Sequence, residues 1–195
     1  MELMARGAEA NVYSLSAFGK DLILKVRERK AYRTTKLDSR LRTERTRNEA
    51  HTLLRLHLAG VRVPGLIAIG RFSICMEKLE GSLLKDTAKT TDIFIRLGRD
   101  LALMHDSGTV HGDFTPANVM VCDAQPYLID FGLSSFTNGM EDKAMDLLLM
   151  KRAVSARLYK ALAEAYVENS GNGKEVMLRL ADVEKRGRYQ NRNLE

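Results

Sequence analysis

Hydrophobic and polar residues alternate over two stretches near the start of the chain. Residues 3–16 are predicted to form a hairpin with Gly7 at its turn, and residues 20–27 alternate as a further strand. Two apolar runs of strand length, at 63–70 and 72–76, predict a second strand pair. The first part of the chain is therefore expected to form a small antiparallel sheet.

Longer stretches carry apolar residues at helical spacing. A helix is predicted between the two strand pairs, over about residues 38–59. Its inward face is marked by Ala50, Leu53, Leu54, His57 and Leu58. A second helix is predicted at 91–106, followed by Gly108, and a third begins near Asn138 or Glu141. Two more amphipathic helices are predicted at 154–167 and 173–185, so the second part of the chain is expected to be mostly helical.

Composition changes this picture little. The chain has 195 residues, a net charge of +6, 45% hydrophobic and 29% charged residues, which is ordinary for one globular domain or two small lobes. No apolar run approaches the roughly 20 residues that span a bilayer, and there is no secretory signal pattern, so we expect a soluble cytoplasmic protein. Cys75 and Cys122 lie in apolar runs, which suits buried free thiols better than a disulfide or a metal site.

The candidate chemistry lies between His111 and Gly132. Asp113 is followed, after four residues, by Asn118, and an apolar run delivers Asp130 in a DFG sequence. This layout is typical of phosphoryl transfer: one carboxylate orients or deprotonates the acceptor, while an amide and a second carboxylate hold Mg²⁺ against ATP phosphates. The plain alternative is a loop whose polar residues only cap turns.

Two short strands are expected between these groups. They cover 119–122 and 126–129 and are joined by a tight turn, which we place at residues 123–126. A hairpin of that length brings Asn118 and Asp130 close together, where one cation can bridge them.

Lys25 lies on the predicted strand 20–27, between Leu24 and Val26. A lysine there can reach ATP phosphates if a glutamate on the next helix holds it; alone, it is more often a solvated strand residue. Glu49 is the favoured partner because it lies beside the apolar stripe, whereas Glu44 lies among arginines near the helix start.

Two backbone segments are candidates for contacts with the nucleotide. The predicted turn Gly7, Ala8, Glu9 and Ala10 lets backbone N–H groups approach phosphates, although one glycine stands where an ordinary protein kinase has three. After the second strand pair, Met76 is expected at the back wall of an adenine pocket. Glu77 and Leu79 would offer main-chain groups there; an ordinary strand-to-helix loop is the alternative.

Other residues near this centre are assigned supporting roles. His111 is expected to pack beneath the catalytic loop, and Asp146 to brace that loop from below. The segment 27–47 is strongly basic, either as a solvated loop or as a surface that faces phosphate or nucleic acid.

With these residues assembled, the chain resembles the small atypical kinase subunits of the KEOPS complex, the relatives of p53-related protein kinase. The motifs that carry the resemblance span nearly the whole chain: ARGAEA at 5–10, ILKVR at 23–27, RNEA at 47–50, MEKLEG at 76–81, HGDFTPANVM at 111–120, IDFGLSS at 129–135 and EDKAMDL at 141–147. The last two, with no activation segment between them, are the most specific.

The resemblance implies an α+β, minimal two-lobed protein-kinase-like fold. We expect an N-terminal lobe over 1–78, with an antiparallel sheet and one helix, and a small helical C-terminal lobe over 79–195, ending in a basic tail at 185–195. It also implies binding of ATP and Mg²⁺, with serine/threonine phosphorylation or ATP hydrolysis in support of threonylcarbamoyladenosine formation in tRNA. The implied partners are the threonylcarbamoyl-transferring subunit and other KEOPS subunits, with possible tRNA contacts through 27–47 and the tail.

The resemblance assigns roles within the site. Asp113 and Lys25 are the catalytic candidates, with Asn118 and Asp130 as Mg²⁺ ligands and Glu49 as the residue that fixes Lys25. Gly112 stands where protein kinases usually carry an arginine that pairs with a phosphorylated activation loop, and neither that arginine nor an Ala-Pro-Glu motif is present. We therefore expect a protein partner, rather than loop phosphorylation, to set the activity.

Two other functions remain open on the sequence. A small-molecule kinase of the aminoglycoside or choline type also uses an HGD motif with the same spacing to asparagine, but only about 60 residues follow Gly132, few for a deep acceptor pocket. A scaffold without chemistry is the third possibility, and the intact Lys25, Asp113, Asn118 and Asp130 argue against it.

Overall fold

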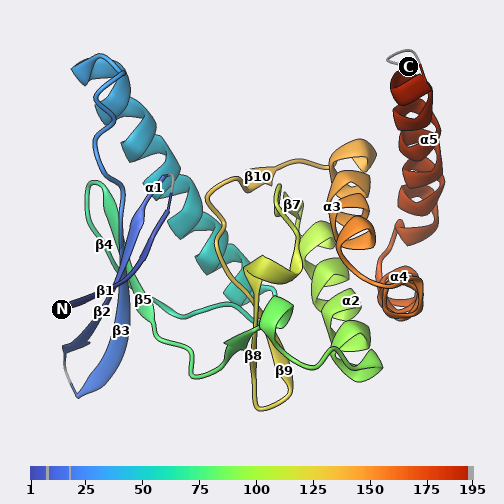
Figure 1. The fold of residues 1–195 in the computed structure, drawn as a ribbon, viewed down its shortest axis with the longest axis horizontal. Coiled ribbons are helices and arrows are strands. Elements are labelled where there is room, and N and C mark those ends of the chain that lie inside the picture. Colours follow the sequence, from blue (N-terminus) through green and yellow to red (C-terminus); the bar gives the residue numbers. More distant parts are fainter. Residues whose placement is uncertain (8, 18, 193–195) are drawn as a thin grey trace.

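The structure is a computed structural model, and it describes residues 1–7, 9–17 and 19–192, with side chains except over 187–192. Two lobes make up the molecule (Figure 1). The N-terminal lobe holds a sheet and one long helix, and the C-terminal lobe is mostly helical. The expected α+β, kinase-like architecture is confirmed.

Five antiparallel strands form the N-terminal sheet, in the order β1-β2-β3-β5-β4. Their bounds are β1 (Glu2–Arg6), β2 (Asn11–Ala17), β3 (Lys20–Val26), β4 (Leu66–Ile69) and β5 (Ser73–Glu77). All of them were expected, β1 to β3 from the hairpin and the alternating pattern and β4 and β5 from the two apolar runs. Lys25 of β3 lies opposite Val12 of β2 and Ile74 of β5. Because β3 is paired with a strand on each side, the position of Lys25 in the sheet is fixed.

Helix α1 (Thr35–Leu58) follows the sheet strand β3, but its buried face differs from the prediction. Ala50 and Leu53 are buried as expected, together with Leu56, while Leu54 is half exposed and Leu58 is 87% exposed. His57 is exposed as well. The buried stripe continues through polar residues, Thr46, Glu49 and Thr52. Glu49 and Thr52 have hydrogen-bond partners inside the protein, and a hydrophobic pattern alone cannot find a buried stripe that includes such polar residues.

The C-terminal lobe is built from helices that pack in pairs. Its elements are β6 (Ser82–Leu83), α2 (Thr91–Asp106), β7 (Thr109–Val110), β8 (Val119–Cys122), β9 (Gln125–Leu128), β10 (Ser135–Phe136), α3 (Met140–Ala153), α4 (Ala156–Asn169) and α5 (Gly173–Arg192), with two 3₁₀ turns at Leu84–Asp86 and Pro116–Asn118. Helix α2 packs against α4, and α3 against α5. Because α5 continues to Arg192, most of the predicted basic tail 185–195 is the end of a helix; residues 193–195 lie outside the described part.

The hairpin β8–β9 turns more tightly than predicted. Only Asp123 and Ala124 form its turn, with φ angles of 48° and 59°, and Gln125 and Pro126 belong to β9. Two consecutive residues with positive φ are the signature of a type I′ turn, whose twist matches that of the flanking strands. The strand β9 is at the edge of its sheet, which tolerates Pro126.

One hydrophobic core runs through both lobes. It joins Leu53 and Leu56 of α1 with Phe114, Leu128 and Phe131 beside the HGD and DFG sequences. Phe114 and Phe131 therefore anchor the two motifs in the same core as α1. Both cysteines are free and partly buried, as expected. Among the described residues no helix is long and apolar enough to cross a membrane.

Candidate active site

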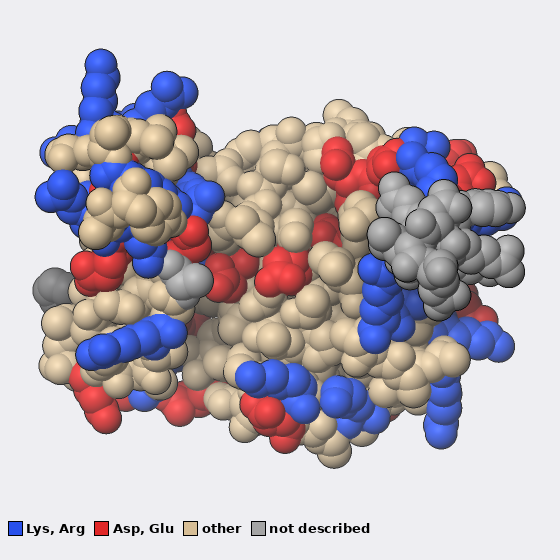
Figure 2. Space-filling model, turned by 45° about the horizontal axis from the view of Figure 1, so that its top comes forward, with Lys and Arg blue, Asp and Glu red and all other residues tan. Residues whose placement is uncertain are grey.

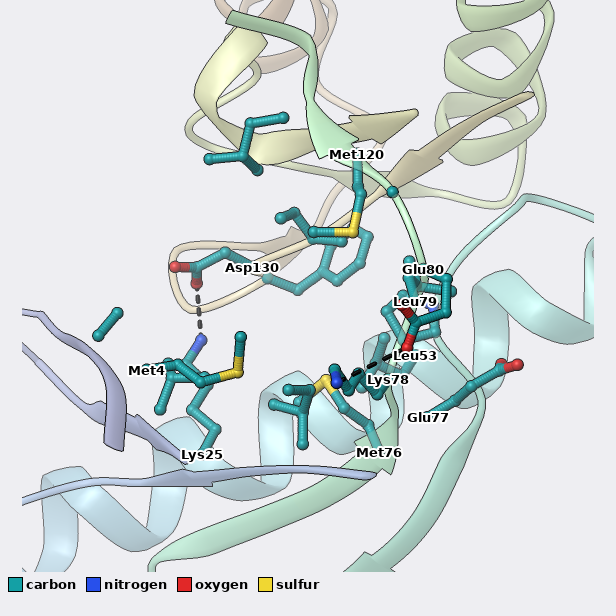
Figure 3. Close-up of a pocket in the computed structure, with 18 of the residues that line it drawn as sticks. Met4, Lys25, Leu53, Met76, Glu77, Lys78, Leu79, Glu80, Met120 and Asp130 are labelled. Atoms are coloured by element: carbon teal, nitrogen blue, oxygen red, sulfur yellow. Dashed lines mark hydrogen bonds and ion pairs between the residues drawn. The ribbon is translucent and has the colours of Figure 1, made fainter. Parts of the chain in front are cut away.

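A cleft of about 550 Å³ lies between the two lobes. Most of its lining is apolar, and it includes Met4, Val12, Ile23, Leu53, Met76, Met120 and Ile129. Lys25 and Asp130 lie at one end and the connector between the lobes, with Leu79, at the other (Figure 3). A slot with apolar walls that ends at a lysine suits a flat ring that carries an anionic substituent.

Met76, Glu77 and Leu79 all line this cleft, as the sequence predicted. The Glu77 N–H is donated to the Gly65 carbonyl at 2.9 Å, and the Lys78 N–H to the Asp21 carbonyl at 3.3 Å. Glu77 therefore has only its carbonyl left to offer a base, while a donor would come from Leu79.

An adjoining cavity of about 360 Å³ lies beneath the β1–β2 turn. Gly7, Glu9 and Ala10 line it, together with Lys25, Asp113 and Asp130. The Gly7 N–H donates to the Ala10 carbonyl at 2.9 Å, and Glu9 pairs with Arg45 and Arg33, which holds the turn against α1. The predicted contribution of Ala8 lies outside the described residues.

Lys25 contacts two carboxylates. Its Nζ lies 2.7 Å from Glu49 Oε1 and 2.7 Å from Asp130 Oδ1 (Figure 3 shows the second contact). The predicted Lys25–Glu49 pair is thus confirmed, and Glu49 is only 1% exposed. The rival, Glu44, is exposed and pairs with Arg40 on its own helix.

Asp130 adopts the left-handed backbone region, with φ 61°. Aspartate is among the few residues other than glycine that visit this region, and such conformations gather at functional sites. Burial alone would raise the pKa of Asp130, but the charge and hydrogen bond of Lys25, with the Gly132 N–H, hold that pKa below its ordinary value. The carboxylate is therefore ionised at neutral pH, the state that binds a cation.

Asn118 and Asp113 contact each other directly. The Asn118 Nδ2 donates to both the carboxylate and the carbonyl of Asp113, each at 2.8 Å. This orientation commits the NH₂ group and leaves the amide oxygen Oδ1 as a ligand. The Ile129 N–H donates to the Asn118 carbonyl at 3.0 Å, so the backbone just before Asp130 is joined to Asn118 as the hairpin argument predicted.

The backbone of the loop around Asp113 is held by Asp146 of α3. The Asp146 carboxylate accepts the N–H groups of His111 at 2.7 Å and Gly112 at 2.9 Å. The His111 Nδ1 accepts the Asp113 N–H, so its Nε2 carries the proton donated to the Ile129 carbonyl at 3.2 Å. The supporting positions predicted for His111 and Asp146 are confirmed.

Asp146 belongs to a buried polar chain that the sequence did not reveal. His105 is fully buried and contacts Asp146 Oδ2 through Nε2 at 3.2 Å and the Tyr166 hydroxyl through Nδ1 at 2.9 Å. Burial lowers the pKa of His105, and the neighbouring Asp146 only partly opposes this. This series of hydrogen-bonded side chains links α4, α2 and α3 to the loop that carries Asp113.

Comparison with known proteins agrees with this geometry. Residues 15–155 match the model of the RIO domain. The chain is 35% identical to the KEOPS complex subunit Bud32 of Pyrococcus abyssi, over 99% of this chain and 98% of that protein. It is 33% identical to a probable serine/threonine-protein kinase, the BUD32 homolog of Archaeoglobus fulgidus, over 94% of each.

The chain belongs to the Bud32 family of RIO-domain proteins.

Longer proteins also match this chain. A probable bifunctional tRNA threonylcarbamoyladenosine biosynthesis protein of Methanothermobacter thermautotrophicus is 32% identical over 96% of this chain, which spans 36% of that relative's length. Among solved structures, the Rio2 kinase of Chaetomium thermophilum, in a complex with ADP, Mg²⁺ and phosphoaspartate, has a TM-score of 0.64 at 20% identity, over 97% of this chain and 72% of that one. This likeness shows the fold that the Bud32-family chain adopts.

The donor set of the site suits Mg²⁺. Among the described residues no three His, Cys, Asp or Glu side chains gather to hold a metal by themselves. Asn118 Oδ1 and the Asp130 carboxylate supply an amide and a carboxylate oxygen, and Mg²⁺ commonly takes its other ligands from phosphates and water.

Arg27 is the site residue that sequence reasoning did not single out. It follows β3, is 3% exposed and donates from Nη2 to Glu49 Oε2 at 2.6 Å. The only sequence signal was its spacing of two residues from Lys25, which places both side chains on one side of the strand. It was counted instead within the basic segment 27–47.

Gly112 has a structural reason to be glycine. Its φ is 79°, and a Cβ there would lie 2.4 Å from the Leu133 carbonyl oxygen, so the arginine of ordinary kinases has no room. We expect Gly112→Ala to lower the free energy of unfolding by about 2 kcal/mol or more, since strain adds to the clash. Urea unfolding measures it.

Gly60→Ala is the matched control, because Gly60 has φ 80° and nothing within 4 Å of an added Cβ. It should cost only the strain, about 1–2 kcal/mol. Equal losses in the two variants would contradict the close approach at Leu133.

His105 should make stability depend on pH. Because its folded pKa is lowered, the unfolded chain takes up a proton below about pH 6.5 that the folded chain refuses, so the free energy of unfolding falls on acidification. Asp100 opposes this trend, since burial raises its pKa to about 6 despite Arg62.

A comparison of variants isolates the histidine. His105→Gln should flatten the fall between pH 6.5 and 5 in chemical denaturation, whereas exposed His57→Gln should leave it unchanged. An unaltered slope in His105→Gln would show that His105 titrates normally in the folded chain.

Proposed function

We propose that this chain binds Mg-ATP in the cleft and transfers its γ-phosphoryl group, as the kinase or ATPase component that supports threonylcarbamoyladenosine formation in tRNA. The observation that carries the proposal is the convergence of Lys25, Glu49, Asp113, Asn118 and Asp130, from four separate segments, at one end of an apolar slot. Such a constellation is what phosphoryl transfer requires.

Each group has a role that its contacts support. Lys25, on the rigid strand β3 and held by Glu49, would position the phosphates. Asn118 Oδ1 and Asp130 would hold Mg²⁺, which neutralises charge on the phosphates when bound. Asp113, hydrogen-bonded to Asn118, would orient or deprotonate the acceptor hydroxyl or water.

The partners come from the relatives. Bud32 of Pyrococcus abyssi is a subunit of the KEOPS complex. We infer that this chain acts beside a threonylcarbamoyl-transferring subunit and other KEOPS subunits, and in the cytoplasm. The lobe boundary at 78/79 and the adenine contacts of Glu77 and Leu79 are part of the same proposal.

The basic charge of segment 27–47 supports contact with tRNA, but fewer of its cationic side chains are unpaired than the sequence implied. Figure 2 shows basic side chains gathered over the N-terminal lobe and acidic ones along the hollow beside it. Within the segment, arginines 27, 33, 40, 42 and 45 pair with acidic residues of this chain. Arg29, Lys36 and Arg47 are exposed and are the residues we propose for phosphate contact, together with the basic end of the chain.

Activation by a partner fits the segment after DFG. From Gly132 the chain enters β10, which pairs with β7, and reaches α3 at Met140. No loop of the kind that phosphorylation orders lies in this interval. A partner protein is therefore the proposed regulator.

The test is to follow labelled γ-phosphate from ATP, with and without the transferring subunit and tRNA. Label on protein that falls when the partner is added supports a kinase restrained in its complex. Free phosphate that rises with partner and tRNA supports an ATPase. Transfer to neither acceptor in any combination would contradict the proposal and favour a scaffold, and transfer to a small alcohol would favour the small-molecule kinase.

Lys25→Ala should lower turnover roughly 10³-fold or more, because it removes a group that stabilises charge on the transferring phosphate. Glu49→Ala should cost less, because Glu49 only orients Lys25. Steady-state kinetics with ATP measures both variants. Lys20→Ala, an exposed lysine on the same strand, should retain full activity. A larger loss in Glu49→Ala than in Lys25→Ala would contradict these roles.

Asp113→Ala should abolish turnover while ATP binding persists, since Asp113 acts on the acceptor. Calorimetric titration with ATP and Mg²⁺, together with the label assay, separates the two effects. Asp182→Ala, an exposed carboxylate on α5, is the control that should change neither. Full tRNA-modifying activity of Asp113→Ala in the reconstituted complex would contradict the catalytic role.

A further inference from the structure

The buried carboxylate of Glu49 has two cationic partners rather than one. Oε1 contacts Lys25 Nζ at 2.7 Å, and Oε2 contacts Arg27 Nη2 at 2.6 Å. All three side chains are nearly excluded from solvent, at 1%, 9% and 3% exposure for Glu49, Lys25 and Arg27. Each oxygen thus has its own partner, and both partners come from the same end of β3.

Of the two partners of Glu49, Lys25 is the one that also contacts another group of the site. Its Nζ also lies 2.7 Å from Asp130 Oδ1, which belongs to the proposed Mg²⁺ site. With Mg-ATP bound, Asp130 would hold the cation and Lys25 would contact the phosphates. Glu49 would then depend on a lysine that is changing its contacts, and an unpaired carboxylate at that depth is strongly unfavourable.

The backbone of Arg27 is held in place by hydrogen bonds to two other segments. Its N–H donates to the Phe72 carbonyl at 2.8 Å, and its carbonyl accepts from Arg42 Nη1 at 3.3 Å. The Arg42 guanidinium in turn lies over the Phe72 ring, 3.7 Å from its centre. The backbone of Arg27 is therefore joined both to the β4–β5 turn and to α1.

A second set of contacts holds the same part of α1 from the other lobe. Asn48 Nδ2 donates to the Ser134 carbonyl at 2.7 Å, and the hydroxyls of Thr52 and Ser134 lie 2.9 Å apart. Residues on either side of Glu49 are thereby joined to the chain just after DFG. The inward position of α1 needs no phosphorylated loop to hold it.

We propose that Arg27 is a positioning residue for phosphoryl transfer: it keeps Glu49, and with it α1, at the cleft while Lys25 exchanges Asp130 for the phosphates of the nucleotide. The inference rests on the proposed function of this site and adds to it the group that prepares Lys25.

A direct contact between Arg27 and the phosphates is the competing explanation. Arg27 also lines the cavity shared by Lys25, Asp113 and Asp130. The two explanations differ in one respect. If Arg27 acts through Glu49, replacing Arg27 should not lower activity further once Glu49 has been removed. If Arg27 binds the phosphates directly, its replacement should lower activity in either background.

The experiment is a double-mutant cycle of Arg27→Met and Glu49→Ala in the full chain, with kcat and KM for ATP measured in each variant. We expect Arg27→Met alone to lower kcat/KM about tenfold, mostly in kcat, and to add less than about twofold in the Glu49→Ala background. Arg27→Lys should recover part of the loss. Lys20→Met, which removes a positive charge from an exposed residue of the same strand, should match the wild type.

An Arg27→Met loss of equal size in both backgrounds would overturn the proposal in favour of direct phosphate contact. Kinetics equal to the wild type would overturn it altogether. Amide exchange on the nucleotide-free chain separates this result from a failure of the proposed function. If the wild type turns over no ATP, the proposed function fails, and the positioning role is then tested by exchange alone: Arg27→Met should raise exchange over residues 46–56 and Lys20→Met should not. Equal exchange in the two variants would contradict it.

Discussion

The buried carboxylate of Glu49 is the constraint on which the N-terminal lobe depends, because the lobe has to supply cationic partners for it. A buried charge is tolerated only where it is paired and hydrogen-bonded. Lys25 of β3 and Arg27, which follows this strand directly, meet that requirement, and α1 is held at the depth that lets Glu49 reach them. The pairing therefore fixes the helix, and the helix in turn contacts the chain after DFG through Asn48 and Thr52.

The C-terminal lobe applies a similar solution to the loop that carries Asp113. Asp146 is buried and accepts two backbone N–H groups of that loop, and His105 and Tyr166 extend the chain of contacts into α2 and α4. In both lobes a buried acid fixes backbone or side chains that face the cleft. The groups that would do the chemistry then lie between two rigid supports, as pre-organised catalysis requires.

Sequence reasoning found the groups whose spacing carries information. Asp113, Asn118 and Asp130 fall at positions set by a hairpin, and Glu49 stands out as an acid beside an apolar stripe. Sequence reasoning failed where the burial of a side chain depends on partners from distant segments. The predicted inward face of α1 included Leu54 and Leu58, which are exposed, and missed Thr52, which is buried against Ser134 of the other lobe. Arg27 was not recognised for the same reason: apart from its spacing of two residues from Lys25, nothing local distinguishes it from the exposed cations that follow.

A crystal structure of the chain with Mg²⁺ and a non-hydrolysable ATP analogue tests the central claim most directly. The account predicts the base between Met76 and Met120, Mg²⁺ on Asn118 and Asp130, and Lys25 on the phosphates, with Glu49 still bound to Arg27. An analogue bound outside the cleft, or a Glu49 that has left Arg27 and turned out of the cleft with α1, would contradict it.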